Sequence, residues 1–188
     1  AAVAGLRPVV ELMSMSFSLV ASDQIINMAA KIRYMSGGQV KVPMVLRAPT
    51  GGGVQLGATH SQSFENWFAS VPGLKVVTPS SPYDALGLLR SSIEDDNPVM
   101  FAENALLYGM RGEVPDDEFR VPIGKSDVKR AGTDITLVGW AHGVVTLLDA
   151  ADKLAETGVS AEVVDLRTLR PLDMDTVIES VEKTGRAL

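Results

Sequence analysis

The chain has 188 residues, of which 46% are hydrophobic, so it can bury the core of one ordinary domain, or of one domain and part of another. Its formal net charge of −6 argues against a nucleic-acid binder, because such proteins carry clustered lysine and arginine. It contains no cysteine, which excludes disulfides, thiolate catalysis and cysteine-ligated metals, and no apolar run approaches the roughly 20 residues of a membrane span.

Apolar strands and amphipathic helices alternate in residues 8–104. We predict strands at 8–12, 43–49, 74–79 and 97–104, and helices at 17–35, 62–71 and 81–95. The strand at 8–12 has the composition of a buried strand. The helix at 17–35 stops at the SGG sequence of 36–38, and the helix at 81–95 starts with Ser81 as N-cap and Pro82 in its first turn.

The alternation stops at residues 105–133, which are polar and contain two prolines, and we predict a linker at 111–130. It resumes with strands at 134–140 and 160–167 and helices at 143–157 and 173–184. This order predicts an α/β fold: a three-layer α/β/α unit with a mostly parallel sheet in 1–110, and part of a second α/β unit in 131–188.

The two ends of the chain lack the features of a complete protein. It begins AAVAGLRPVVEL without a methionine, and it stops at EKTGRAL, directly after a predicted helix. We therefore expect a fragment that lacks both native termini.

The segment RAPTGGGVQLGATHSQS, residues 47–63, combines four glycines with one of the two histidines, His60. It matches neither a Walker loop nor a G-x-G-x-x-G dinucleotide loop, so a phosphate-binding role is disfavoured. The loop follows the carboxyl end of a predicted strand, where open parallel sheets bind ligands. His60 precedes a predicted helix start, and the residues alone leave a capping role and an acid–base role open.

The other candidate residues favour structural roles. His142 lies between a strand and a helix, and Asp84 on its helix is expected to face solvent or to cap a neighbour. The EDDN turn at 94–97 has oxygen ligands for a hard cation, although ordinary acidic turns are common. Met13 and Phe17, at a strand–helix junction, are typical of core packing.

Several segments in order carry a resemblance that no single motif has. The chain resembles the β subunit of the pyruvate dehydrogenase first component, a thiamine-diphosphate-dependent enzyme of the transketolase-like superfamily. The similarity spans essentially the whole sequence, and the segments that carry it include AGLRPVVELM, DQIINMAAKIRYMSGGQ, GGGVQLGATHSQSFENWF, PGLKVVTPSSPYDALGLL and VVDLRTLRPLD.

The resemblance implies a pyrimidine-binding transketolase-like domain at 1–110, a linker at 111–130, and the first part of a transketolase C-terminal-type domain at 131–188. It implies oxidative decarboxylation of pyruvate with acetyl transfer to lipoamide, which links glycolysis to acetyl-CoA. It also implies an α2β2 heterotetramer with a second β subunit and with an α subunit that holds the diphosphate and Mg²⁺. A lipoyl-bearing acyltransferase component would be a further partner, and neither nucleic acid nor membrane is expected. The compartment would be the bacterial cytoplasm, the plastid stroma or the mitochondrial matrix.

The resemblance also implies site residues. His60 matches the catalytic histidine near the thiazolium and substrate, Phe17 the aromatic packed on the aminopyrimidine ring, and Met13 the neighbouring cofactor contact. The residues that match a structural K⁺ site, formed largely by backbone carbonyls, are Met44, Ser92, Ile93, Asp95 and Asn97.

One family residue has no match in this sequence. The catalytic glutamate that bonds the pyrimidine ring lies before the AAVAGLRP segment in the family, and Glu11 follows the next strand and is no substitute. We therefore expect the 188-residue chain to be inactive even with an α subunit. The alternatives are a β subunit acting on branched-chain 2-oxo acids or acetoin, and a truncated module that only mediates interactions.

Overall fold

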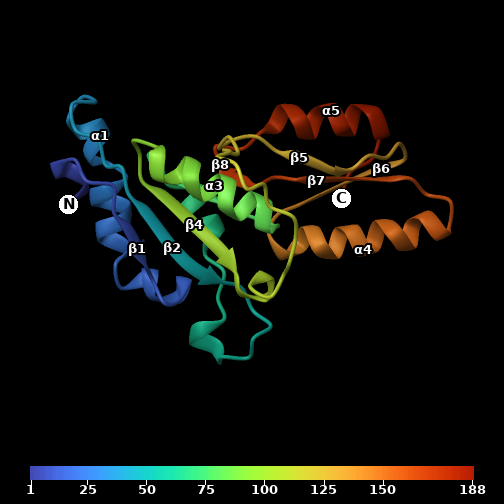
Figure 1. Cartoon of the computed structure of the whole chain (residues 1–188), viewed down its shortest axis with the longest axis horizontal. Coiled ribbons are helices and arrows are strands. Elements are labelled where there is room, and N and C mark those ends of the chain that lie inside the picture. The colour runs from blue at the N-terminus through green and yellow to red at the C-terminus, as the bar shows by residue number, and fades with distance from the viewer.

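The computed structural model describes all 188 residues and has two α/β units side by side along its long axis (Figure 1). The strands are β1 (Val9–Glu11), β2 (Val45–Thr50), β3 (Lys75–Val77), β4 (Val99–Asn104), β5 (Asp127–Arg130), β6 (Ile135–Gly139), β7 (Ala161–Asp165) and β8 (Thr168–Arg170). The α-helices are α1 (Ile32–Met35), α2 (Glu65–Ala69), α3 (Pro82–Glu94), α4 (His142–Glu156) and α5 (Met174–Thr184). None of these helices combines the length and the hydrophobicity that a membrane span requires.

The first unit is built on a five-stranded sheet in the order β1-β2-β4-β3-β8. The first four strands in this order run parallel, and only β8 is antiparallel, to β3. Because β2, β3 and β4 end at the same edge, the loops that follow them gather there. The predicted α/β class with a mostly parallel sheet is confirmed.

Alternate side chains of the central strands serve two separate cores, as strand geometry requires. Leu46 and Met100 face a core that includes Phe68 of α2, whereas Val45 and Phe101 face a second core with Leu88 of α3. The sheet is therefore covered on both faces, which gives the expected three layers.

The strand at β1 departs from its prediction, because it is exposed rather than buried. Val9 and Val10 keep 48% and 37% of their surface accessible. A run of apolar residues is typical of a buried central strand, but β1 pairs with β2 alone and lies at the edge of the sheet.

The single helix predicted at 17–35 is divided into shorter pieces. A 3₁₀ turn spans Met15–Leu19, a π-helical segment spans Gln24–Ala29, and only Ile32–Met35 is α-helical. Ile25 lies in the core, as its apolar spacing predicts, but Val20 is 92% exposed. Apolar spacing also does not distinguish α from π or 3₁₀ hydrogen bonding.

The start of α3 forms as predicted. The Ser81 side chain accepts a hydrogen bond from the backbone N–H of Asp84 at 3.1 Å, and Pro82 occupies the first turn, where its missing N–H costs nothing.

The second unit has a three-stranded sheet in the order β5-β7-β6, with β6 and β7 parallel. Helix α4 packs its apolar side on one face, where Val144 and Ala151 meet Leu137 and Val163. Helix α5 covers the other face (Figure 1), where Thr136 of β6 bonds hydroxyls of α5.

The connection between the two units involves two strands, β5 and β8, that the sequence did not predict. Residues 127–130, at the end of the predicted linker, form β5, and β8 crosses back to pair with β3 of the first sheet. Upstream of β5 the segment packs along α3, with Phe119 stacked on Tyr83 at 4.5 Å and Val121 buried. Within the segment predicted as a linker, residues 119–123 therefore pack against α3 and residues 127–130 join the second sheet, whereas residues 111–118 are mostly exposed.

Buried charges also join the two units. We call Asp84, Asp127, Lys129, Asp165 and Arg167 the ionic cluster. Asp84 of α3 is fully buried and meets Lys129 at 2.7 Å and Arg167 at 2.6 Å. The expectation that Asp84 faces solvent is therefore wrong, because β5 and the β7–β8 turn cover this end of α3. Its carboxylate does bond a neighbour, since it accepts a hydrogen bond from the hydroxyl of the N-cap Ser81 at 2.6 Å.

Candidate functional site

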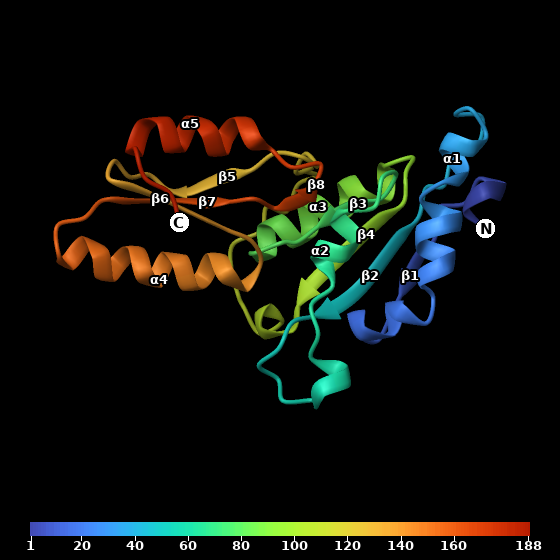
Figure 2. The same cartoon turned by 180° about the vertical axis from the view of Figure 1, so that it is seen from behind.

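The glycine loop leaves the carboxyl end of β2 and projects beyond the ends of β2 and β4 (Figures 1 and 2). Gly51 and Gly53 have positive φ values of 92° and 99°. A Cβ on Gly51 would lie 2.7 Å from the Asn104 side chain, and one on Gly53 would lie 2.9 Å from Leu106. The loop therefore needs glycine at both positions for its backbone conformation, and it packs closely against the last residue of β4 and the segment that follows.

His60 lies exposed on the 3₁₀ turn Ala58–His60 of this loop. Its Nδ1 is 2.9 Å from the Thr59 hydroxyl oxygen, and its ring meets the Phe17 ring edge to face, with centroids 5.1 Å apart at 89°. Residues 43 positions apart in the chain thus form one aromatic pair. The family resemblance predicts that both residues belong to one cofactor site, and in the structure they are in contact.

Phe17 is held in place by the local structure that follows β1. The Ser14 hydroxyl accepts a hydrogen bond from the Ser16 N–H and starts the 3₁₀ turn Met15–Leu19. Met15 is fully buried and anchors that turn, which leaves Phe17 half-buried toward His60. Met13 is 80% exposed and makes no core contact, so packing does not explain it.

The helix expected directly after His60 begins later. Helix α2 starts at Glu65, so His60 does not lie at the N-terminus of this helix. The Thr50 hydroxyl donates to Glu65 Oε1 at 2.6 Å, and this buried bond ties the end of β2 to the start of α2. The two ends of the glycine loop are therefore fastened while its tip projects.

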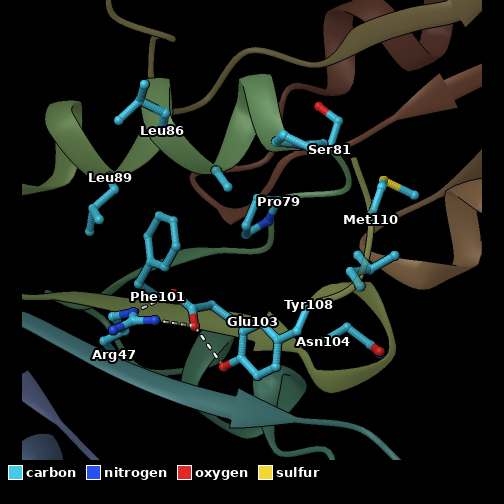
Figure 3. A pocket seen from close by; sticks show the side chains of 13 residues that line it. Arg47, Pro79, Ser81, Leu86, Leu89, Phe101, Glu103, Asn104, Tyr108 and Met110 are labelled. Atoms are coloured by element: carbon cyan, nitrogen blue, oxygen red, sulfur yellow. Dashed lines mark hydrogen bonds and ion pairs between the residues drawn. The ribbon is translucent and has the colours of Figure 1, made fainter. Parts of the chain in front are cut away.

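A pocket of about 380 Å³ lies near the same sheet edge, on the face that α3 covers (Figure 3). Arg47 of β2 donates from Nε and Nη2 to Glu103 of β4 at 2.5 and 3.0 Å, and Tyr108 donates to the same carboxylate at 2.7 Å. Leu86 and Leu89 of α3 form the apolar wall. The sequence analysis missed this group, although Arg47 and Glu103 both lie on predicted strands.

The network holds its protons firmly. The pKa of Tyr108 is raised well above its ordinary value of 10, mainly by burial of the phenol and secondly by its hydrogen bond to Glu103. The hydrogen bond to Glu103 raises the pKa of Arg47. Because Arg47 also meets Glu11 at 3.3 Å, its charge is already compensated, and the pocket has no free cation for an anionic ligand.

His142 is the first residue of α4 and lines a cavity of about 460 Å³ between the two units. Ser63, Glu65 and Asn104 of the first unit line its other side. The two histidines lie on different units, and no contact joins them.

The residues that the resemblance assigns to K⁺ gather around the turn after α3, but the fit is poor. The Arg7 guanidinium donates to the carbonyl oxygens of Ile93 and Asp95 at 3.0 and 2.9 Å. The Asp95 carboxylate pairs with Lys75 and accepts from Asn97, and the Met44 carbonyl accepts from the Val99 N–H at 2.9 Å. Ser92 directs its hydroxyl to the Leu88 carbonyl. A cation is thus already bonded to two of the expected ligands, and we assign no role to K⁺.

Comparison with known families decides what this arrangement belongs to. Residues 1–110 match the family model of the transketolase pyrimidine-binding domain, and residues 124–188 match that of the transketolase C-terminal domain. The chain belongs to the transketolase family. The Phe17–His60 pair and the glycine loop lie within the part that matches the pyrimidine-binding domain.

Named relatives in this family match almost the whole chain. It is 51% identical over 187 residues to the pyruvate dehydrogenase E1 component subunit beta of Rhizobium meliloti (99% of this chain, 41% of the relative). It is 53% identical to the mitochondrial subunit of Caenorhabditis elegans, with 98% and 53% covered. It is also 51% identical to the acetoin:2,6-dichlorophenolindophenol oxidoreductase subunit beta of Cupriavidus necator, with 99% and 55% covered. The chain spans about half the length of these relatives.

Solved structures agree on the fold. A split-gene transketolase, described as an inactive beta4 tetramer, superimposes with a TM-score of 0.80 at 25% identity and covers 99% of this chain and 57% of its own. The transketolase of Pichia stipitis superimposes at 0.65 with 18% identity and covers 94% of this chain and 25% of its own, which supports the fold alone.

Proposed function

We propose that this chain is the pyrimidine-binding part, with the adjoining C-terminal-type part, of the β subunit of a thiamine-diphosphate-dependent pyruvate dehydrogenase first component. The reaction is the oxidative decarboxylation of pyruvate, with transfer of the acetyl group to a lipoyl group. The observation that carries the proposal is the contact between Phe17 and His60, which lies at the ligand-binding edge of a pyrimidine-binding domain.

The exposed groups at this edge fit a flat heteroaromatic ring. Phe17 offers an aromatic side and Met13 an exposed thioether at the end of β1, and both groups make favourable contacts with aromatic rings. The cofactor would supply the carbon nucleophile and the electron sink for decarboxylation. Phe17 would hold its pyrimidine ring in one orientation.

His60 has the geometry for proton transfer or oxyanion stabilisation. When the Thr59 hydroxyl donates to Nδ1, the proton of the neutral imidazole lies on Nε2. That N–H can donate to the carboxylate or to the developing oxyanion of a 2-oxo acid substrate. The edge-to-face contact with Phe17 limits rotation of the imidazole and so keeps Nε2 directed at one place.

The remaining parts of the proposed enzyme lie outside this chain. We propose that an α subunit binds the diphosphate and Mg²⁺, that two α and two β subunits form the active unit, and that a lipoyl-bearing acyltransferase accepts the acetyl group. The identity to pyruvate dehydrogenase subunits over nearly the whole chain supports this assignment.

The test uses α2β2 enzyme assembled from the α subunit and a complete β subunit that carries this sequence. Pyruvate-dependent reduction of 2,6-dichlorophenolindophenol measures turnover. We expect His60→Ala to lower kcat about 10²- to 10⁴-fold with little change in cofactor affinity. Phe17→Ala should weaken cofactor binding roughly 2- to 10-fold, the value of one aromatic contact.

His142→Ala is the matched control and should leave turnover and cofactor affinity unchanged. Full activity of His60→Ala, with the assembly intact, would contradict the proposal.

A second candidate is acetoin cleavage, because an acetoin oxidoreductase subunit is as similar to this chain as the pyruvate dehydrogenase subunits are. Parallel assays with pyruvate, acetoin and 3-methyl-2-oxobutanoate separate the candidates. Turnover of acetoin or of the branched acid alone would replace the pyruvate assignment.

A further inference from the structure

A second cavity, of about 700 Å³, lies at the opposite end of the first sheet from the Phe17–His60 pair. Gly73 precedes β3 and Asn97 precedes β4, so the cavity is at the amino ends of these strands. Lys31, Arg33 and Tyr34 line it from the α1 segment. Its size is within the range of small-molecule sites, roughly 300–1,000 Å³.

Two positive charges in this cavity have only neutral partners. The Lys31 ammonium donates to the Pro72 carbonyl oxygen at 2.6 Å, and the Arg33 guanidinium donates to Asn97 Oδ1 at 2.6 Å. Neither group has a carboxylate within the 4.0 Å of an ion pair, and no acidic residue lines the cavity. Each cation keeps further N–H donors that these bonds do not use.

The other basic side chains at this end of the sheet are already paired. Arg7 and Lys41 share Asp96, and Lys75 pairs with Asp95. Lys31 and Arg33 therefore give the cavity a local charge of opposite sign to the net −6 of the chain. An anion bound between them would form charge-assisted hydrogen bonds, which are stronger than bonds between neutral groups.

The wall of the cavity also offers an aromatic face and an open rim. Tyr34 is 88% exposed, so its ring is available for stacking. Gly37 and Gly38 adopt positive φ values of 62° and 82°, with no atom within 4 Å of where a Cβ would lie. These two glycines add no side chains to the rim, so their exposed backbone is accessible to a ligand.

We infer that this cavity binds a nucleoside diphosphate or a closely related phosphate-bearing nucleotide. Lys31 and Arg33 bind the phosphates, and Tyr34 stacks on the base. The site is separate from the Phe17–His60 pair, and the inference does not depend on the proposed reaction.

The test is a titration of the 188-residue chain with fluorescently labelled ADP, with competition by unlabelled ADP, inorganic pyrophosphate, adenosine and thiamine diphosphate. We expect saturable binding with a dissociation constant below about 1 mM, displaced by ADP better than by pyrophosphate or adenosine alone. The affinity should fall with added salt, because the contacts are charged.

The variants separate this site from non-specific attraction. Lys31→Met and Arg33→Met should each weaken ADP binding about tenfold or more. Tyr34→Ala should weaken it about fivefold or more. Because the Tyr34 side chain is exposed, this change tests the site without disturbing the core. Lys41→Met removes an exposed lysine at the same end and should change nothing. Circular dichroism on each variant confirms that it is folded.

Four results would overturn the inference. One is the absence of saturable ADP binding, and another is binding that Lys41→Met weakens as much as Lys31→Met does. The third is displacement of labelled ADP by thiamine diphosphate that is the same in wild type and in the Lys31 and Arg33 variants. This result would place the bound nucleotide elsewhere. Pyrophosphate binding equal to that of ADP, with no effect of Tyr34→Ala, would also refute a nucleotide site.

Discussion

Removal of Arg167 should destabilise the protein more than removal of any surface charge. Its guanidinium is largely buried and lies 2.6 Å from Asp84 and 2.9 Å from Asp127. With all five groups of the ionic cluster ionised, three carboxylates face two cations, and Arg167→Met leaves three carboxylates against one lysine. Breaking a buried pair in this way costs about 3–5 kcal/mol, because the remaining charge stays out of water.

Urea unfolding followed by circular dichroism measures the effect. Arg120→Met is the matched control, because Arg120 pairs with Glu94 on the surface, where such a pair contributes at most about 1 kcal/mol. The double variant Arg167→Met/Asp84→Asn restores the charge of the original cluster. Its loss of stability should therefore be smaller than the sum of the two single losses, by about 1 kcal/mol or more.

The pH dependence supplies an independent check. Burial raises the pKa of Asp84, but the hydrogen bonds from Lys129 and Ser81 and the charge of Arg167 outweigh it and hold the pKa below the ordinary 3.8. The stability that Asp84 contributes is thus present above pH 3.8 and lost as the pH falls through the folded pKa. In Arg167→Met the same carboxylate loses a cation and takes up a proton more readily. The difference between wild type and variant should therefore shrink as the pH is lowered from 7.

The reasoning is refuted if Arg167→Met costs less than about 1 kcal/mol at neutral pH. Strict additivity in the double variant would equally show that the two groups do not interact.

Two further variants test the packing of the two units. Phe68→Ala should lose about 3–5 kcal/mol of unfolding free energy, since Phe68 is 2% exposed in the core beneath α2. The neighbouring Trp67 is about half-exposed, so Trp67→Ala should lose clearly less in the same urea titration. Gly132→Ala should lose about 1–3 kcal/mol, because its Cβ would lie 2.2 Å from backbone atoms of the neighbouring strand β7, which cannot move aside. Gly143→Ala meets no atom within 4 Å and should not lower the melting temperature, so equal melting temperatures for the two glycine variants would show that the close approach at Gly132 does not exist.

Much of the candidate site depended on information that is not local. The pattern of strands and glycines was enough to place the glycine loop at the carboxyl end of β2. This end is where ligands bind in parallel sheets, because the strands end at one edge. The residues alone left both a capping and an acid–base role open for His60, and only the fold shows it in contact with Phe17. The Arg47–Glu103–Tyr108 network had no local signal, since its members come together only when β2 pairs with β4.

The sequence by itself determined the alternation of strands and helices, the start of α3 at Ser81–Pro82, and the α/β class with its two units. These features depend on hydrophobic periodicity and on capping chemistry, which act over a few residues. The tertiary structure decided the exposure of Val9 and Val10, the existence of β5 and β8, and the burial of Asp84. The physical reason is that strand order, edge position and ion pairing between units are set by contacts between residues far apart in the chain, which local patterns do not encode.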